Sequence, residues 1–148
     1  MFYLLKVNFY ELNTIKDDEL LFAVIMTKFN GQWLYVRHKD RQTWEIPGGH
    51  REENERINDA ASRELIEETG ATKFSLTPIC IYSVESDESI EYTESFGQLF
   101  YSEVETIEEL LHFEICEIKL FDNMPEDLTY PLIQPVLHKE VLEFLKKE

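Results

Sequence analysis

One stretch in the middle of the chain, residues 48 to 71, constrains the fold more than any other. It opens with two glycines, Gly48 and Gly49, and its helical pattern runs from about residue 56 to residue 69 and ends at Gly70. Apolar residues recur along one side of this helix: Ile57, Ala61 and Leu65, with Ala60 at the edge. We therefore expect a glycine-bounded helix that packs on a larger element.

Three glutamates of this helix occupy positions where solvated charges are not expected. On a helical wheel, Glu64 and Glu68 fall within the apolar arc and Glu67 lies beside it. Glu64 and Glu68 are also four residues apart, and like charges at this spacing destabilise an isolated helix by roughly a few tenths of a kcal/mol. Arg63 is a nearby cation, but one guanidinium does not neutralise three carboxylates. Two interpretations follow: a chance acidic cluster in solvent, or carboxylates that share divalent metal ions, with Mg²⁺ or Mn²⁺ suited to oxygen ligands.

The remaining sequence predicts an α/β layered domain with a mixed sheet. Asn30 and Gly31 stand between two apolar runs, which is a strong β-hairpin signal. Pro135 starts a second helix near the C-terminus, and its final lysines suit the helix dipole. A length of 148 residues is that of one ordinary domain, which we expect to span residues 1–148. The expected strands are 1–12, 20–29, 31–39, 43–49, 74–86, 90–104 and 114–121, and the expected helix 134–148 has its apolar positions at Val136, Leu137, Val141, Leu142 and Leu145.

The composition limits the partners of this chain, because its formal net charge is -16. Such a charge repels a nucleic-acid backbone and an anionic membrane surface, so we expect neither as a partner. Cys80 and Cys116 are far apart and form no CxxC pair, which indicates two reduced thiols and not a zinc site or a disulfide framework. The apolar N-terminal run is interrupted by Lys6 and reads as a strand, not as a signal peptide. We expect a cytoplasmic protein.

The central stretch resembles the Nudix box, whose pattern is G-x5-E-x7-R-E-U-x-E-E-x-G-U, with U an apolar residue. Gly49 opens the match, Glu55 follows after five residues, and Arg63 follows after seven more. The other fixed positions are Glu64, Leu65, Glu67, Glu68, Gly70 and Ala71. The resemblance covers 23 residues. It implies the Nudix fold, an α/β/α sandwich around a mixed β-sheet, and hydrolysis of a nucleoside diphosphate linked to another moiety.

The resemblance also implies a set of metal ligands. Glu64, Glu67 and Glu68 would bind Mg²⁺ or Mn²⁺ together with the backbone carbonyl at Gly49, and Glu64 would also orient or deprotonate the attacking water. Many members of the family use a further acidic residue from the loop before a late strand. Three residues qualify here: Glu114, which is our first choice, and Glu109 and Glu117.

Other residues of the box would support these ligands. Arg63 would pair with a box glutamate, either Glu55 or Glu64, and hold its rotamer. Gly48 and Gly49 would permit a tight turn that brings the backbone close to the substrate.

Substrate selection depends on residues outside the box. The short chain looks most like the MutT-type enzymes, which convert a nucleoside triphosphate, in some cases an oxidised one, to a monophosphate and pyrophosphate. A nucleobase needs a stacking face, and we expect Trp44 to provide it and Arg37 to contact phosphates. Residues 127–133 are a further candidate for the base pocket. Other candidates are the aromatic residues Phe2, Tyr3, Trp33, Tyr35, Phe96 and Tyr130, and the basic residues His38, Lys39, Arg41 and His50.

Two other functions stay open at this point. One is a non-catalytic Nudix domain that binds a nucleotide or a protein as a sensor. The other is an enzyme that acts on the 5′ triphosphate end of RNA. The complete box argues against the first, and the acidic net charge disfavours the second, because RNA binding needs a basic surface.

Overall fold

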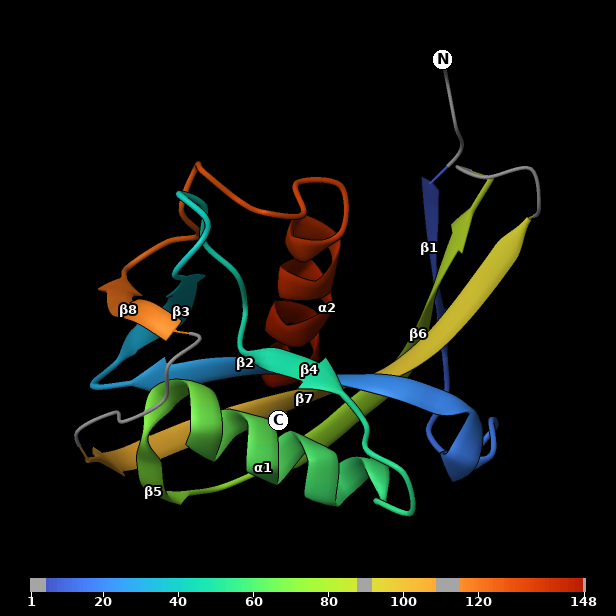
Figure 1. Cartoon of the computed structure of the whole chain (residues 1–148), viewed down its shortest axis with the longest axis horizontal. Coiled ribbons are helices and arrows are strands. Elements are labelled where there is room, and N and C mark those ends of the chain that lie inside the picture. Colours follow the sequence, from blue (N-terminus) through green and yellow to red (C-terminus); the bar gives the residue numbers. More distant parts are fainter. Residues whose placement is uncertain (1–4, 88–91, 109–114, 148) are drawn as a thin grey trace.

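The computed structural model describes residues 5–87, 92–108 and 115–147, and shows a sheet with one α-helix inserted in the middle of the chain and a second at its end (Figure 1). Within these residues it contains eight strands, two α-helices and one short 3-10 helix. The elements are β1 (Leu5–Tyr10), η1 (Asp17–Glu19), β2 (Leu20–Phe29), β3 (Gln32–His38), β4 (Gly48–His50), α1 (Ile57–Thr69), β5 (Ala71–Phe74), β6 (Thr77–Ser86), β7 (Thr93–Ile107), β8 (Ile115–Phe121) and α2 (Gln134–Lys146).

The sheet is mixed, as the sequence predicted. Its strands follow the order β1-β6-β7-β2-β3-β8, with β4 paired to β2 and β5 paired to β7. The β2–β7 pair is parallel, and the other pairs are antiparallel. The hairpin between β2 and β3 is confirmed, since Asn30 and Gly31 have φ angles of 54° and 77°, the left-handed values that a two-residue hairpin turn needs.

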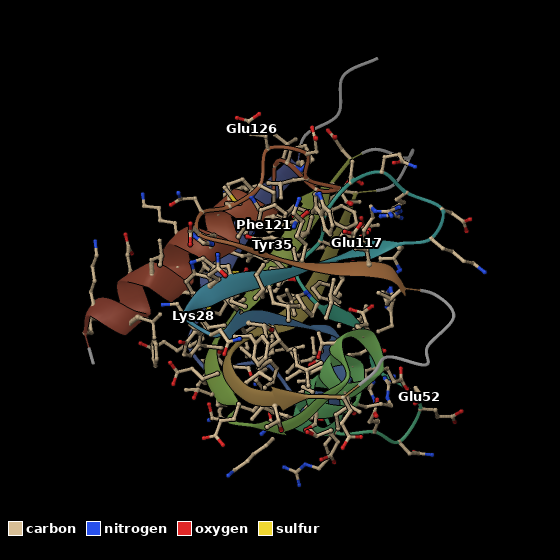
Figure 2. All side chains as sticks on the ribbon, turned by 90° about the vertical axis from the view of Figure 1, so that its left-hand side faces the viewer. Lys28, Tyr35, Glu52, Glu117, Phe121 and Glu126 are labelled. Atoms are coloured by element: carbon tan, nitrogen blue, oxygen red, sulfur yellow. The ribbon has the colours of Figure 1, made fainter. Side chains whose placement is uncertain are left out.

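The two α-helices cover opposite faces of the sheet, which confirms the sandwich. Successive residues of a strand point to opposite faces, and β2 shows the alternation clearly. Ala23 and Ile25 are buried in the cluster that includes α1, whereas Met26 is buried in the cluster that includes α2. On the α2 side the rings of Tyr35 on β3 and Phe121 on β8 meet edge to face, with centroids 5.6 Å apart (Figure 2). These two cores fix α1 and α2 relative to β2 and β4.

The apolar stripe of α2 is narrower than the sequence indicated. Leu137 and Val141 are buried and Leu145 packs against the same core. Val136 and Leu142 are 37% and 38% exposed. The helix packs on the sheet through one line of side chains, and Val136 and Leu142 fall on the flanks of this line.

The strand expected at residues 43–49 is also placed differently. Residues before Gly48 form only isolated bridges, Val36–Glu45 and Trp44–Leu128, and the strand is β4. Pro47 cannot donate a backbone hydrogen bond, although its carbonyl accepts one of 2.8 Å from the N–H of Ile25. Pairing with β2 therefore starts only at the glycines that follow the proline.

Candidate active site

Helix α1 carries the predicted site and is anchored from outside its own sequence. Arg56, at the N-cap position, makes no capping bond through its side chain. Asp17 of η1 takes over this function, since its carboxylate oxygens lie 3.2 and 3.4 Å from the backbone N–H of Ile57. At the other end Gly70 adopts a left-handed conformation with φ 77° and ends the helix, as predicted.

The burial of α1 matches the arc inferred from the sequence. Ile57, Ala60, Ala61 and Leu65 are buried against the sheet. Glu68 is 5% exposed, which is far less than an ordinary surface glutamate. The side chains of Glu64 and Glu67 are 14% and 37% exposed. The three glutamates therefore lie at the border of the core and not on a solvated face.

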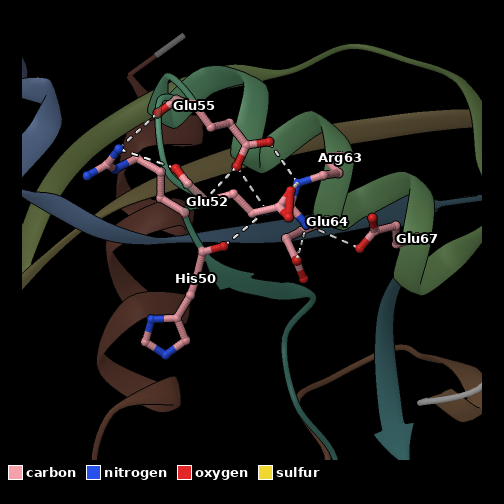
Figure 3. A network of polar contacts seen from close by, with 7 residues as sticks. His50, Glu52, Glu55, Arg63, Glu64 and Glu67 are labelled. Carbon is pink, nitrogen blue, oxygen red and sulfur yellow. Dashed lines mark hydrogen bonds and ion pairs between the residues drawn. The ribbon is translucent and has the colours of Figure 1, made fainter.

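Arg63 holds most of the carboxylates of the box together (Figure 3). Its guanidinium donates to Glu55 at 2.7 and 2.9 Å and to Glu64 at 2.6 Å. A further bond of 3.2 Å reaches Glu67, and Glu52 forms an ion pair at 3.0 Å. The predicted partners Glu55 and Glu64 are thus both confirmed, because the planar guanidinium presents several donors at once.

The pKa shifts of Glu55 and Arg63 favour the charged forms of these two groups. The hydrogen bonds from Arg63 hold the pKa of Glu55 below its usual value. The same bonds, those to Glu55 first and Glu64 next, raise the pKa of Arg63. The Glu55 carboxylate also accepts the backbone N–H of Glu52 at 3.0 Å, which orders the loop between β4 and α1.

The glycines of β4 bring the backbone against these carboxylates. A Cβ atom on Gly49 would lie 2.3 Å from one carboxylate oxygen of Glu64, so any larger residue there would displace the Glu64 side chain. The backbone N–H of Gly48 donates to Glu68 at 2.9 Å. The second carboxylate oxygen of Glu68 lies 3.5 Å from His38 Nε2. Both glycines therefore lie close to these carboxylates, as residues of strand β4 and not of a turn, and their predicted approach to the substrate stays a prediction.

An apolar cavity of about 340 Å³ lies on the other side of β4. Its walls come from β2, β6, β4 and the start of α2, and the backbone of Gly48 and Gly49 belongs to them. In Figure 3 the ring of His50 points away from the carboxylates, and it meets Phe22 of the cavity wall edge to face. The lining residues are Phe22, Val24, Glu45, Ile46, Gly48, Gly49, His50, Tyr82, Val84, Tyr130, Ile133, Gln134 and Leu137.

A second, more open hollow adjoins this cavity and carries basic residues. His38, Lys39 and Arg41 line it, and it shares Gly48 and Tyr130 with the apolar cavity. Arg41 lies 2.9 Å from Glu45 and also contacts Tyr130, so its charge is partly compensated. Of the basic residues of segment 37–41, which precedes the box, His38, Lys39 and Arg41 therefore lie in the same hollow as Gly48, and Arg37 does not line it.

Arg37 and Trp44, the residues predicted to bind substrate, lie outside both hollows. Arg37 donates to the backbone carbonyl of Arg41 at 2.9 Å and pairs with Glu117 at 3.4 Å. Trp44 packs edge to face on Phe121, with ring centroids 5.4 Å apart, on the α2 side of the sheet. Their roles in substrate binding stay predictions, whereas the expectation for residues 127–133 agrees with Tyr130 and Ile133 in the cavity wall.

Several predicted residues either lie outside the described residues or are placed away from the site. Glu114 and Glu109, the first choice and one alternative for the extra ligand, lie outside the described residues, as do Phe2 and Tyr3. Glu117 is described and is paired with Arg37. Phe96 packs against Tyr10, and Tyr35 is buried in the core. Cys80 is a free thiol whose pKa burial raises to about 12, so it is no nucleophile.

The donor set of the box fits a hard divalent cation, although the carboxylates are not gathered around one point. Among the described residues, no three histidine, cysteine or acidic side chains are arranged to hold a metal ion together. Glu64 and Glu67 point an oxygen at Arg63 instead, and Glu68 accepts from Gly48. At least four carboxylates share this one guanidinium, so further positive charge is favourable here, and oxygen ligands suit Mg²⁺ or Mn²⁺.

Some residues that reach the site from a distance carry no recognisable signal in the sequence. Asp17 caps α1, and Arg51 donates to the carbonyls of Asp18 at 2.8 Å and Leu20 at 3.0 Å, which fastens the box loop to the start of β2. Gln134 was read only as the start of a helix, although it lines the cavity. No local pattern marks such contacts, because each joins segments more than thirty residues apart or depends on how α2 meets the sheet.

Comparison with known proteins decides the family. The model of the NUDIX domain matches residues 19–135, which is most of the chain. The chain belongs to the NUDIX domain family. In the described part of the chain, neither α-helix has the length and apolar content that crossing a membrane requires.

Individual relatives agree with this assignment. The chain is 34% identical over 106 residues to a Bacillus subtilis (strain 168) protein named "Putative 8-oxo-dGTP diphosphatase YtkD", and the match covers 71% of this chain and 64% of YtkD, less than two thirds of that protein. A second protein of that strain, named "Putative 8-oxo-dGTP diphosphatase", is 37% identical over 59 residues, or 40% of each chain. A mutant of the Bacillus subtilis pyrophosphohydrolase BsRppH has the same fold, with a TM-score of 0.76, 24% identity and 97% of each chain covered.

Proposed function

We propose that this Nudix protein is a divalent-metal-dependent pyrophosphohydrolase that converts a nucleoside triphosphate, in ordinary or oxidised form, to a monophosphate and pyrophosphate. One observation carries the proposal. The box carboxylates lie on one side of the Gly48–Gly49 backbone, and an apolar cavity of base-binding size, about 340 Å³, lies on the other. A nucleotide that lies across β4 would have its base in the cavity and its phosphates near the glutamates.

The box residues have complementary tasks in this proposal. Glu64, Glu67 and Glu68 would hold Mg²⁺ or Mn²⁺, and the carbonyl at Gly49 is a further candidate ligand. When bound, the cation supplies positive charge that offsets the negative charge on the phosphate oxygens and on the leaving group. Glu64 would orient the attacking water and accept its proton, and Arg63 would hold the carboxylates of Glu64 and Glu67 in place through its hydrogen bonds.

The names of the relatives support the choice of substrate class. YtkD is named for 8-oxo-dGTP, and we carry a nucleoside triphosphate substrate over to this chain on the strength of that likeness and of the cavity. His38, Lys39 and Arg41 line the neighbouring hollow and are suited to contact phosphates, with Arg37 and Trp44 retained as weaker candidates. We also propose that residues 1–148 form a single domain and that Glu114 is an additional metal ligand. A cytoplasmic location is proposed as well, because nucleotides and reduced thiols such as Cys80 occur there.

A product assay tests the proposal. The purified protein is incubated with Mg²⁺ and ATP, GTP, 8-oxo-dGTP, ADP-ribose, a diadenosine polyphosphate or a nucleotide sugar, and the products are separated by chromatography. We expect a monophosphate and pyrophosphate from a triphosphate, and no product in EDTA. Glu67→Gln should lower kcat by roughly two orders of magnitude or more, because it removes a charge from the metal site.

The matched control is Glu53→Gln, which makes the same change at an exposed glutamate of the box loop. It should keep wild-type kcat. Tight nucleotide binding without turnover of any compound would favour a sensor and overturn the enzyme. Turnover of a triphosphorylated RNA in preference to free nucleotides, with a steep salt dependence, would favour the RNA 5′-end alternative instead.

A further inference from the structure

Arg51 lies in the loop between β4 and α1, and its side chain binds the protein backbone. Its Nε donates to the carbonyl of Leu20 at 3.0 Å, and its Nη2 donates to the carbonyl of Asp18 at 2.8 Å. Its Nη1 donates to the carbonyl of Glu55 at 3.2 Å and to that of Glu52 at 3.4 Å. Because a guanidinium presents its N–H donors in one rigid plane, these carbonyls are held in a defined arrangement around it.

The carbonyls around this guanidinium come from two segments that are distant in the sequence. The first pair lies in η1 and at the start of β2, and the second pair lies in the box loop. The backbone N–H of Arg51 adds a bond of 2.8 Å to the carbonyl of Leu21. A loop outside helices and strands lacks a regular hydrogen-bond ladder and is mobile unless other groups hold it. Arg51 therefore sets the position of the box loop relative to the sheet.

The two loop residues that Arg51 holds by their backbone are also partners of Arg63. The Glu55 carboxylate accepts from Arg63 at 2.7 and 2.9 Å, and the Glu52 carboxylate lies 3.0 Å from it. Arg63 donates as well to the carbonyl of His50 at 3.0 Å. Figure 3 shows these loop residues converging on Arg63. The loop thus lies between two guanidinium groups, one of which holds its backbone while the other binds its carboxylates.

The position of Arg63 affects in turn the carboxylates of the helix. Its Nη1 donates to Glu64 at 2.6 Å and to Glu67 at 3.2 Å, and these are two of the proposed metal ligands. The long side chain of an arginine has many rotamers, and only its partners select one of them. A shift of the box loop would therefore move the guanidinium of Arg63 and, with it, the oxygens that a cation needs.

We propose that Arg51 is a positioning residue for the metal site. It acts through the box loop on Arg63, and Arg63 orients the carboxylates of Glu64 and Glu67. The inference rests on the proposed function, since it takes these two glutamates as ligands of the cation. It goes beyond the box pattern, in which position 51 is not one of the fixed residues.

Arg51→Lys tests the geometry without a change of charge. A lysine keeps the positive charge, but its single ammonium group cannot reproduce the planar set of donors. The matched control is Arg56→Lys, which makes the same change at an exposed arginine of the same loop whose side chain makes no capping bond to α1. A difference between the two variants therefore cannot come from net charge. Thermal melts show the temperature range in which each variant is folded.

The first readout is the Kd of Mn²⁺, measured by calorimetry on protein freed of metal with EDTA, at a temperature where every variant is folded. Arg51→Lys should raise this Kd about tenfold, as residues that orient metal ligands do at the lower end of their range, and Arg56→Lys should leave it unchanged. The second readout is steady-state kinetics with the triphosphate. Arg51→Lys should lower kcat about tenfold with little change in KM. A merely structural role would lower the Tm and leave both readouts unchanged.

A double-mutant cycle with Arg63→Met tests the route of the effect. If Arg51 acts through Arg63, adding Arg51→Lys to Arg63→Met should change the Kd of Mn²⁺ by less than about twofold, whereas independent effects would multiply. A further loss of about tenfold in the double variant would overturn the action through Arg63.

The outcomes also separate this role from the enzymatic activity. An unchanged Kd of Mn²⁺ in Arg51→Lys, or equal changes in Arg51→Lys and Arg56→Lys, would overturn the role of Arg51 while leaving the hydrolase intact. A wild type that binds Mn²⁺ but hydrolyses no nucleotide, with binding weakened in Arg51→Lys alone, would support the positioning role and overturn the enzymatic proposal. A wild type that binds no Mn²⁺ would overturn both.

Discussion

Replacing Gly49 by alanine tests how closely β4 approaches the carboxylates of the box. A Cβ at this position would lie 2.3 Å from one Glu64 oxygen and 2.5 Å from its carboxyl carbon, where ordinary contacts begin at 3.4 Å. The carboxylate must therefore retreat by roughly 1 Å, because overlapping atoms cannot be tolerated in a packed site. The φ of Gly49 is not positive, so alanine does not strain the backbone itself.

The expected loss of activity follows from the displacement of the Glu64 carboxylate. A displacement of about 1 Å at a catalytic group costs on the order of 100-fold in rate. This loss corresponds to roughly 2.7 kcal/mol of transition-state stabilisation. The stability should change little, since the clash is with the end of a rotatable side chain. Alanine also lowers the conformational entropy of the unfolded chain, which stabilises the folded state by about 0.4–1 kcal/mol.

Gly48→Ala is the informative contrast. Its Cβ would lie 2.4 Å from the backbone carbonyl oxygen of Ala23 and 3.0 Å from the Cα of Val24. Backbone atoms of β2 cannot rotate away, so this variant should lose about 1–3 kcal/mol of stability through overpacking. Gly31→Ala, in the distant hairpin turn, should lose stability because alanine is strained at its φ of 77°, but should keep wild-type kcat.

The assay combines kcat for the triphosphate found in the product assay with thermal melts in EDTA. Gly49→Ala should retain its Tm and lose activity, whereas Gly48→Ala should lose Tm as well. Wild-type kcat in Gly49→Ala would refute the inference that Glu64 must stay against β4. A Tm of Gly48→Ala equal to that of the wild type would refute the close packing of β4 on β2.

Three further predictions concern residues that hold α1 and the box in place or pack against the sheet. Arg63→Met should lower the unfolding free energy in EDTA by about 2 kcal/mol, because charge-assisted bonds to Glu55 and Glu64 are lost. Mg²⁺ should reduce the difference in stability between this variant and the wild type, and an unchanged Tm in EDTA would contradict the prediction. Asp17→Ala should cost about 1 kcal/mol in urea unfolding through the lost cap of α1, with kcat nearly unchanged, and Asp18→Ala serves as the control. Burial lowers the pKa of His138, so the folded state binds fewer protons than the unfolded state, and the unfolding free energy should fall as the pH falls below 6.5. His138→Phe should reduce this dependence of the unfolding free energy on pH, measured by urea unfolding between about pH 6.5 and pH 5. An unchanged pH dependence in the variant would contradict the role of His138.

The sequence by itself determined the parts of the site that depend on local spacing. Gly70 ends α1, and the positions of Glu64 and Glu68 on the helix follow from 3.6 residues per turn. The hairpin at Asn30–Gly31 follows from the left-handed conformation that these two residues adopt readily. These features were predicted correctly because residues close in sequence decide them.

Only the tertiary structure decided which side chains meet across the sheet. Arg37 was preferred over His38, yet it is His38 that lies beside Glu68, because neighbouring residues of β3 face different surroundings and the register shifts between these two. Gln134 reaches the cavity only because α2 packs over β2 and β6. The position of such a side chain is set by pairing between distant segments, and that pairing is fixed by the packing of the whole core and not by any short stretch of sequence.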